Sequence, residues 1–518
     1  MSRPHSSAHV SRRAFLKAIF TSLGVIGAVP LLAACGVAPA ATPTAAPPAA
    51  PTTAPVAAAA TTAPAAAPTA VAVPASTISA TTAIPGPEQA NIDWQQFKDT
   101  QIRWIGGPHN FSVAVQAMVP EFQALTGIGV TVEVIAWDAY NQKRQFDLSS
   151  SAPQYDAYLA NDGQFDWLFG PAGQLADPNE FINDPKLTDK AWYDLQDVSP
   201  KLMAAASWDG VPGHKVGSGK QWVIPFMQQS SILAYRDDLF QKYKLVVPKT
   251  LEDVVTAAKA ISEGEKANGI AGFATRGQGV AEPLAKLMPE YGAADFDANV
   301  NCTLSSDESI YLHDLMINKI IKPYGPAGWE NLTWDDGRHQ FAQGSYGMFF
   351  EDDYFAALYE DPTQSKVAGK VKYANLGGPK GMFTDAYYFG TAIGQNGKNK
   401  GAAWLLAQWL TSKKAMRDVT VKYHNLMPTR LSTFNDPGFK ELVGSWGGGS
   451  WFQAVNLVTN QSGLSAFTPT DQPDAVRTSW SNAAQKIYEG APVKDTLAAT
   501  ANDINATLEK SGFRKKSG

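Results

Sequence analysis

The order of strands and helices at the start of the folded sequence predicts an α/β protein with a parallel sheet. An apolar strand at Gln101–Ile105 precedes a helix at Ser112–Leu125, whose apolar residues recur at three- and four-residue steps. A second strand at Val130–Ala136, a helix at Trp137–Leu148 and a third strand at Tyr155–Leu159 follow. Because strands that alternate with helices pair in parallel, this β-α-β-α-β order places helices on the faces of one sheet.

Later segments continue the alternation of helices and strands. Thr250 with Asp253 resembles a capping box and predicts a helix that runs to about Glu263. Pro120 lies inside the first predicted helix and predicts a kink or a break there. Further helices are predicted at Pro283–Tyr291, Ser305–Lys319, Asp335–Phe341 and Lys400–Leu410, and further strands at Gly269–Ala274, Val371–Leu376 and Tyr387–Ile393.

The first 34 residues have the composition of an export signal. Ser11-Arg12-Arg13-Ala14-Phe15-Leu16-Lys17 matches the twin-arginine pattern, and a moderately apolar run follows it. The run ends in Leu32-Ala33-Ala34-Cys35, which resembles a lipobox. This resemblance implies that the signal, residues 1–34, is removed before Cys35 and that Cys35 is lipidated, which would anchor the chain to a membrane on the extracytoplasmic side.

Residues 35–91 are predicted to be a disordered tether. The stretch 37–87 consists mainly of Ala, Pro and Thr and contains no charged residue, so it cannot form a packed core. About fifty residues in a polyproline-like state would span on the order of 150 Å. The tether would hold the folded part away from the membrane surface.

Charge and composition exclude several classes of function. The formal net charge is −5, and removal of residues 1–34, which hold four basic residues and no acid, makes the chain more acidic. An acidic chain does not favour nucleic-acid binding. Neither a zinc motif nor a dinucleotide motif is present, so we expect no metal and no cofactor. Cys302 is either a small buried hydrophobe or, less commonly, a reactive thiol. Asp295–Asn299 begins like a calcium loop, but Val300 stands where that loop needs Gly.

The stretch Gln221–Glu252 carries a resemblance to a known family. A proline-containing apolar segment at Trp222–Phe226 is followed by an apolar run at Ser231–Tyr235, then by Arg236-Asp237-Asp238-Leu239-Phe240 and by Pro248-Lys249-Thr250. This pattern resembles the segment that joins the two lobes in extracellular solute-binding proteins of ABC importers, the family that includes the maltodextrin-binding proteins. Further resemblances, in the family's order, are Phe341, Gly344, Gly347 and Met348, then Ala402, Ala403, Trp404, Leu406, Trp409 and Leu410.

The resemblance implies a two-lobe periplasmic-binding-protein type II fold. One lobe would comprise residues 92–224 and 371–426, and the other residues 225–370 and 427–513. The chain would act as a monomeric receptor that closes on a small solute and delivers it to ABC permease subunits.

The candidate ligand residues lie in loops after strands, because open α/β sheets bind ligands beyond the carboxyl ends of their strands. Aromatic rings suit the C–H faces of a sugar or polyol, and amides and carboxylates suit its hydroxyls. At most one of the neighbouring Gln228 and Gln229 should face the ligand, since side chains alternate along a strand. The predicted set is His109, Asn110, Trp137, Asp162, Gln164, Gln228, Gln229, Glu351, Asp352, Tyr354, Tyr388 and Trp446.

Each candidate also has a structural explanation. Asp162 could cap the helix that follows it, and Glu351–Asp353 could be a solvated helix start. Most of the tryptophans should serve packing. If Asp162, Glu351 and Asp352 act together with aromatic rings, they would form a cage for a cation such as a polyamine.

Two other classes of protein remain open. A secreted carbohydrate-active enzyme would need two carboxylates at a fixed separation, which the sequence cannot exclude. A redox protein is suggested only by the twin-arginine signal, and no cofactor motif supports it. The binding protein is the favoured interpretation.

Overall fold

The computed structural model describes residues 84–161, 166–382, 387–422, 427–461 and 467–515. The predicted signal, Cys35 and most of the tether therefore lie outside the described residues, as do Asp162 and Gln164. No helix within the described ranges is long and apolar enough to cross a bilayer.

The first lobe is built on a mixed five-stranded sheet with the order β2-β1-β3-β10-β6. Strand β1 pairs in parallel with β2 and β3, as the β-α-β-α-β pattern predicts, whereas β10 is antiparallel to both β3 and β6. The strands are β1 (Gln101–Gly106), β2 (Gly129–Val134), β3 (Ala157–Asn161), β6 (Pro225–Gln229) and β10 (Tyr387–Ile393). The helices are α2 (Asn110–Thr126), α3 (Trp137–Ser149), α4 (Asp166–Phe169), α5 (Pro178–Ile182), α6 (Lys190–Tyr193), α7 (Pro200–Ala205), α15 (Lys400–Leu410) and α16 (Lys413–Lys422).

The second lobe is built on an antiparallel sheet with the order β8-β7-β9. Its strands are β7 (Ser231–Arg236), β8 (Met348–Asp352) and β9 (Val371–Ala374). Its helices are α8 (Asp237–Tyr243), α9 (Leu251–Gly264), α10 (Ala281–Tyr291), α11 (Asp307–His313), α12 (Lys322–Tyr324), α13 (Trp334–Ala342), α14 (Ala356–Glu360), α19 (Ser450–Gln461), α20 (Pro473–Glu489) and α21 (Val493–Ser511). Helices α17 (Leu431–Phe434) and α18 (Pro437–Gly444) lie between α16 and α19 in the chain and contact them.

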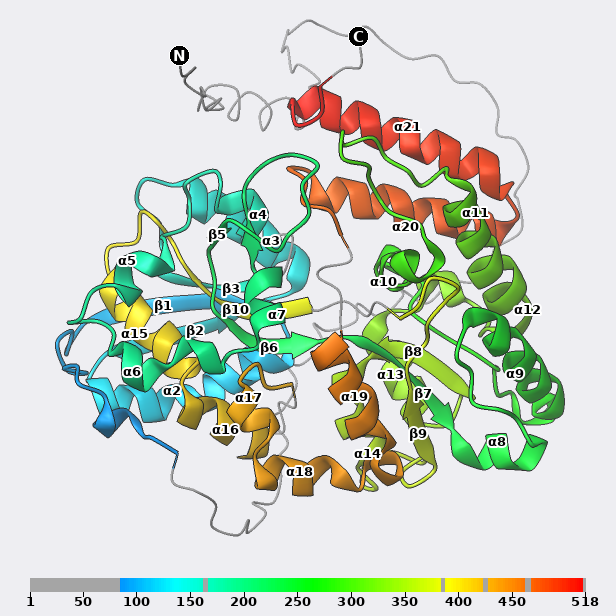
Figure 1. The fold of residues 1–518 in the computed structure, drawn as a ribbon, viewed down its shortest axis with the longest axis horizontal. Helices are drawn as coiled ribbons and strands as arrows, with labels where there is room; N and C mark the ends of the chain where they lie inside the picture. Colours follow the sequence, from blue (N-terminus) through cyan, green and yellow to red (C-terminus); the bar gives the residue numbers. More distant parts are fainter. Residues whose placement is uncertain (1–83, 162–165, 383–386, 423–426, 462–466, 516–518) are drawn as a thin grey trace, which may run out of the picture. The chain divides into compact units, whose positions relative to one another are not determined.

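The chain passes from the first sheet to the second at Ser230, between β6 and β7, which Figure 1 shows as one nearly continuous green ribbon. The strand pairing on either side of this crossing differs from the predicted lobe boundaries in two places. Residues Pro225–Gln229, predicted to belong to the second lobe, pair with β10 in the first sheet. Residues Val371–Ala374, predicted to belong to the first lobe, pair with β7 in the second sheet.

The local signals for helices largely agree with the structure. Thr250 and Asp253 form both hydrogen bonds of a capping box at the start of α9. Helix α2 ends at Gly127, whose φ of 70° needs the conformational freedom of glycine. Pro120 does not break α2, since the helix continues to Thr126. The segment predicted as a strand at Gly269–Ala274 forms only isolated bridges, Ala271 to Tyr346 and Ala274 to Phe349.

Candidate solute-binding site

His109 begins the site on the first lobe. It follows β1 and caps α2, where its Nδ1 accepts a hydrogen bond from the Phe111 N–H at 3.2 Å. Its ring stacks on that of Phe389, with a centroid distance of 4.2 Å, and meets the edge of the Trp137 ring at 6.4 Å. The His109 side chain is buried. Burial, helped by the positive charge of Arg338, lowers the pKa of His109 to about 3, so the imidazole is neutral near pH 7.

Trp137 reaches His109 because a glycine leaves room for it. Trp137 is the first residue of α3, directly after β2 and its short turn. A Cβ added to Gly107 would lie 2.4 Å from the Trp137 ring, so only glycine permits this ring to lie against the backbone after β1. Neighbouring parallel strands thus end in two rings that touch, as the position of these loops predicts.

The candidates on β6 and β10 lie on two opposite faces of the first sheet. Tyr387 pairs with Gln229 and Tyr388 with Gln228, so Gln229 shares a face with Tyr387 and Gln228 shares a face with Tyr388. Tyr388 is fully buried in a small cluster with Leu202, Ala205 and Ala206. Gln228 donates weakly from its Nε2 to the Pro428 carbonyl at 3.4 Å. As expected, only one of the two glutamines lies on the His109 side.

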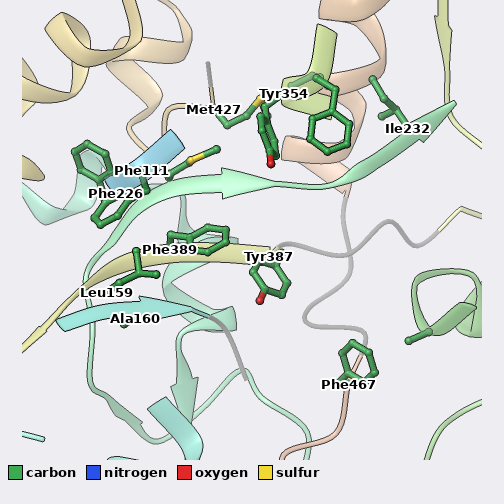
Figure 2. Packing of buried hydrophobic residues seen from close by; sticks show 14 of the residues in the cluster. Phe111, Leu159, Ala160, Phe226, Ile232, Tyr354, Tyr387, Phe389, Met427 and Phe467 are labelled. Atoms are coloured by element: carbon green, nitrogen blue, oxygen red, sulfur yellow. The ribbon is translucent and has the colours of Figure 1, made fainter. Parts of the chain in front are cut away.

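Tyr387 and Phe389 are the ring-bearing residues of β10 on the His109 side, a choice that the sequence did not resolve. Their centroids lie 5.3 Å apart, and Figure 2 shows both rings on β10 beside the ribbon that leads from β6 to β7. The Asn161 Nδ2, at the end of β3, donates to the Tyr387 hydroxyl at 3.0 Å and so positions the phenol ring. Tyr388, which we predicted to contact ligand, points to the opposite face of the strand.

Tyr354 supplies a ring from the second lobe. It follows β8, and its centroid lies 5.5 Å from that of His109, so the rings of the two lobes are in contact. Tyr354 also packs against Phe355 at 4.6 Å. We refer to His109, Trp137, Tyr354, Tyr387 and Phe389 as the ring cluster. It joins loops after β1, β2 and β8 with strand β10.

Unpartnered polar atoms lie next to the ring cluster. The Gln229 Oε1 and the Ser230 Oγ are buried, and within the described ranges neither has a well-aligned hydrogen-bond partner. The Gln229 side chain does lie close enough to His109 to hydrogen-bond its ring, and this raises the pKa of His109 against the effect of burial. A buried polar atom without a partner costs free energy, so these two atoms, at the point where the chain crosses between lobes, are suited to a ligand that supplies hydrogen bonds.

The predicted carboxylates Glu351 and Asp352 are already paired with cations of the second lobe. Glu351 accepts hydrogen bonds from the Thr275 hydroxyl at 3.1 Å and from the Arg276 Nε at 2.9 Å. Asp352 lies 3.3 Å from an Arg276 guanidinium nitrogen and 3.2 Å from the Lys286 Nζ. Arg276 also contacts Glu282 at 2.7 Å.

These five side chains, Arg276, Glu282, Lys286, Glu351 and Asp352, form what we call the charge network. Burial opposes ionisation of Glu282, yet Arg276 and Lys286 lower its pKa to about 2. The charge network holds three carboxylates and two cations, and the charge of Arg477 also acts on Glu282. Because its carboxylates are paired in this way, a structural role is favoured for Glu351 and Asp352 over direct contact with a solute.

Asp353 differs from its two acidic neighbours. It is buried, and neither of its carboxyl oxygens has a hydrogen-bond partner within the described ranges. Burial, together with the charge of Asp352, raises the pKa of Asp353 well above its usual range and so opposes its ionisation. With Tyr359, Asp353 lines a small cavity of the second lobe.

The other candidates are not drawn into the ring cluster. Asn110 is the first residue of α2 and half-buried. Trp446 packs edge-on against Trp451 at 5.2 Å, and no ring contact within the described ranges joins it to His109. Asp162 and Gln164 lie outside the described residues. No group of three or more His, Cys, Asp or Glu side chains in the described part of the chain could hold a metal ion.

Sequence reasoning missed the partners of the acidic residues. Arg276 precedes Glu351 by 75 residues, and Lys286 precedes Asp352 by 66 residues, so no local pattern links them. Arg338, whose charge acts on His109, lies on helix α13, and no sequence pattern links it to His109. Tyr387 and Phe389 could have been separated from Tyr388 only by the pairing of β10.

The chain is similar to several known proteins. The family model "Bacterial extracellular solute-binding protein" matches residues 109–417. An erythritol/L-threitol-binding protein of Mycolicibacterium smegmatis is 26% identical over 420 residues, which cover 79% of this chain and 86% of that protein. A mannitol-binding protein of Pseudomonas aeruginosa is 25% identical over 317 residues, 58% of this chain and 67% of that protein. An ABC transporter solute-binding protein of Agrobacterium radiobacter, solved with ribitol, has a TM-score of 0.69 at 22% identity and covers 79% of this chain and 98% of that one.

Proposed function

Because the chain belongs to the bacterial extracellular solute-binding protein family, we propose that it captures a small polyol or sugar between its two lobes and delivers it to an ABC permease. The observation that carries this proposal is the neutral character of the ring cluster. Its imidazole is uncharged, its rings come from both lobes, and the unpartnered Gln229 Oε1 lies beside it. Relatives named for erythritol and mannitol support the same class of solute.

The ring cluster offers what a polyol needs. Flat rings pack against C–H groups, whereas hydroxyl groups donate to the Gln229 amide oxygen and accept from the phenol. Because His109 and Tyr354 belong to different lobes, a solute held by both would favour the closed arrangement over the open one. Asp162 and Gln164, in the loop after β3, remain proposed ligand residues.

The alternative solute, a polyamine, receives less support. A cation cage needs carboxylates that are free to face the ligand. Glu351 and Asp352 are instead paired with Arg276 and Lys286, and burial raises the pKa of Asp353, which opposes its ionisation. The family and the structural neighbours are solute receptors rather than enzymes. The same pairing makes Glu351 and Asp352 poor candidates for the acid and base of a glycoside hydrolase.

Isothermal titration calorimetry of the purified protein tests this proposal. The panel should contain erythritol, ribitol, mannitol and maltose, with putrescine and spermidine as cations and phosphate as an anion. Binding of a polyol or sugar, without release of a product, is the expected result. Binding of a polyamine alone, or turnover of any sugar, would contradict the proposal.

We also propose that the chain is lipid-anchored through Cys35 on the extracytoplasmic side. The order of the twin-arginine pattern, the lipobox-like Leu32-Ala33-Ala34-Cys35 and an uncharged tether supports this. A Cys35→Ser variant should appear in the detergent-free soluble fraction, while the wild-type protein should partition with membranes. Equal partitioning of both proteins would contradict lipidation at this cysteine.

A further inference from the structure

A hairpin of the first lobe reaches across to the second lobe at a distance from the ring cluster. Strands β4 (Ser207–Trp208) and β5 (Lys220–Gln221) pair antiparallel and enclose the loop 209–219. We call Ser207–Gln221 the clasp hairpin. At its base, the Lys220 Nζ lies 3.1 Å from Asp177 and 4.1 Å from the centroid of the Trp222 ring, both of them contacts within the first lobe.

The loop of the clasp hairpin is held in one conformation. The Trp208 indole N–H donates to the His214 carbonyl at 3.2 Å, and the His214 Nδ1 lies 2.7 Å from the Asp209 carboxylate. Gly219 has a φ of 93°, and a Cβ there would lie 2.5 Å from the Asp209 backbone. The loop therefore presents its tip, Gly213 and Lys215, in a defined position.

The second lobe receives this tip. The Lys215 Nζ lies 3.2 Å from the Asp295 Oδ1 and 2.5 Å from the Thr468 hydroxyl. Asp295 is almost fully buried, with only 3% of its side chain exposed, so its charge is poorly screened by solvent. The Thr468 N–H also donates to Asp295 at 2.6 Å, which fixes the carboxylate as an acceptor for the ammonium.

A close backbone approach and an apolar contact reinforce the ion pair. Gly213 has a φ of 86°, and a Cβ added to it would lie 2.2 Å from the Ala298 carbonyl oxygen. The receiving loop is itself strained, since Val300 has a φ of 62°, which β-branched residues rarely adopt. Trp208 and Val216 of the hairpin form a buried cluster with Trp167, against which Phe513 of the second lobe packs.

We infer that the clasp hairpin is a latch that stabilises the closed arrangement of the lobes without contacting the solute. Its contacts join the same two lobes as the ring cluster but share no residue with it. The inference rests on the proposed function only in that lobe closure is what holds the solute. A latch of this kind raises the fraction of closed protein before the solute binds, and thereby raises the apparent affinity by the same factor.

The latch is tested by Lys215→Met, with Lys220→Met as the matched control. Both variants remove one lysine of the same hairpin, but Lys220 pairs with Asp177 within the first lobe. Cysteines for a donor and an acceptor dye are placed at two exposed lysines, Lys186 on the first lobe and Lys259 on α9. Single-molecule energy transfer then reports the separation of the lobes with and without mannitol or erythritol.

Lys215→Met should shift the solute-free protein towards longer distances and raise the dissociation rate of the solute by about three- to tenfold, as expected if the closed fraction falls by that factor. Lys220→Met should leave both quantities unchanged. Lys215→Arg, which keeps the positive charge, should recover the wild-type distribution. Circular dichroism of each variant checks that it is folded.

The outcomes separate the latch from the proposed function. If Lys215→Met and wild type have the same distance distribution, the latch is refuted. If no polyol or sugar changes the distances of wild type but Lys215→Met still opens the protein, the latch stands and the proposed solute class fails. A folded Gly213→Ala variant is a second test, because its methyl group would meet the Ala298 carbonyl and should also favour the open arrangement.

Discussion

Replacement of Gln229 by methionine should stabilise the solute-free protein and weaken solute binding. The Gln229 Oε1 is buried, and within the described ranges its contact with the His109 ring is too poorly aligned to satisfy it; the residue is only 5% exposed. Methionine has a similar length and no polar acceptor, so it can fill the same space. Opposite signs for stability and affinity are what we expect of a residue kept for binding rather than for folding.

The magnitude follows from the state of this one oxygen atom. A buried acceptor without a partner costs about 1–3 kcal/mol, so its removal should raise the free energy of unfolding by about 1 kcal/mol or more. For a cooperative unit of the size of one lobe, each kcal/mol corresponds to about 2–4 °C in Tm. A lost neutral hydrogen bond to the solute is worth about 0.5–1.5 kcal/mol, which raises Kd by about two- to tenfold.

Differential scanning calorimetry and isothermal titration calorimetry measure the two effects on the same samples. Gln228→Met is the matched control, because Gln228 lies on the opposite face of β6 and donates to the Pro428 carbonyl. It should leave Kd unchanged and should not raise Tm. A lower Tm for Gln229→Met with an unchanged Kd would mean that the Gln229 amide serves the fold, and the reasoning would be refuted.

Three further predictions concern the rings and the charges. Tyr354→Ala should raise Kd by about tenfold or more while Tyr359→Phe leaves it unchanged, measured by calorimetry, because among the described residues of the second lobe it is the Tyr354 ring that meets His109. Arg276→Met should lower the free energy of unfolding by about 3–5 kcal/mol in urea titrations, since it leaves buried carboxylates unpaired, against about 0–1 kcal/mol for the exposed pair broken by Arg103→Met. That difference should shrink as the pH falls from about 4.5 towards 2, where the lowered pKa of Glu282 ceases to stabilise the wild type. Finally, His109 has a pKa of about 3, so Kd should be the same at pH 5 and pH 8. Between pH 6.5 and pH 3 the stability of wild type should fall more steeply than that of His109→Gln, because unfolding of wild type takes up one more proton, while His313, with a pKa lowered to about 4, titrates in both proteins.

The elements of the fold follow from local patterns, and most of them could be predicted. The capping box of Thr250 and Asp253 and the terminating Gly127 depend on residues within one turn, so they act wherever the helix lies. Sheet membership depends on distant residues instead. Val371–Ala374 has the apolar alternation of a strand, but only its pairing with β7 assigns it to the second lobe.

The site shows the same division between local and distant information. The loops after strands could be located from the sequence, and His109, Trp137 and Tyr354 meet in the ring cluster. The sequence could not predict which side chains of β10 face the site, because Tyr387, Tyr388 and Phe389 are all aromatic. A register shift also follows Phe389. One position along the strand separates a ring in the cluster from a ring buried against α7.

The acidic run Glu351-Asp352-Asp353 shows why composition alone is a poor guide to the charge of a site. Three adjacent carboxyl groups after a strand suggest a negative pocket for a cation. In the fold, two of them are paired with Arg276 and Lys286, and burial raises the pKa of the third. Pairing of these carboxylates with cations does not suit a site for a cationic solute, because such a site needs negative charge that is not already compensated. For a site that binds a neutral solute this pairing is consistent, because it weakens the field of the carboxylates at a cluster of rings and amides that recognise hydroxyl groups.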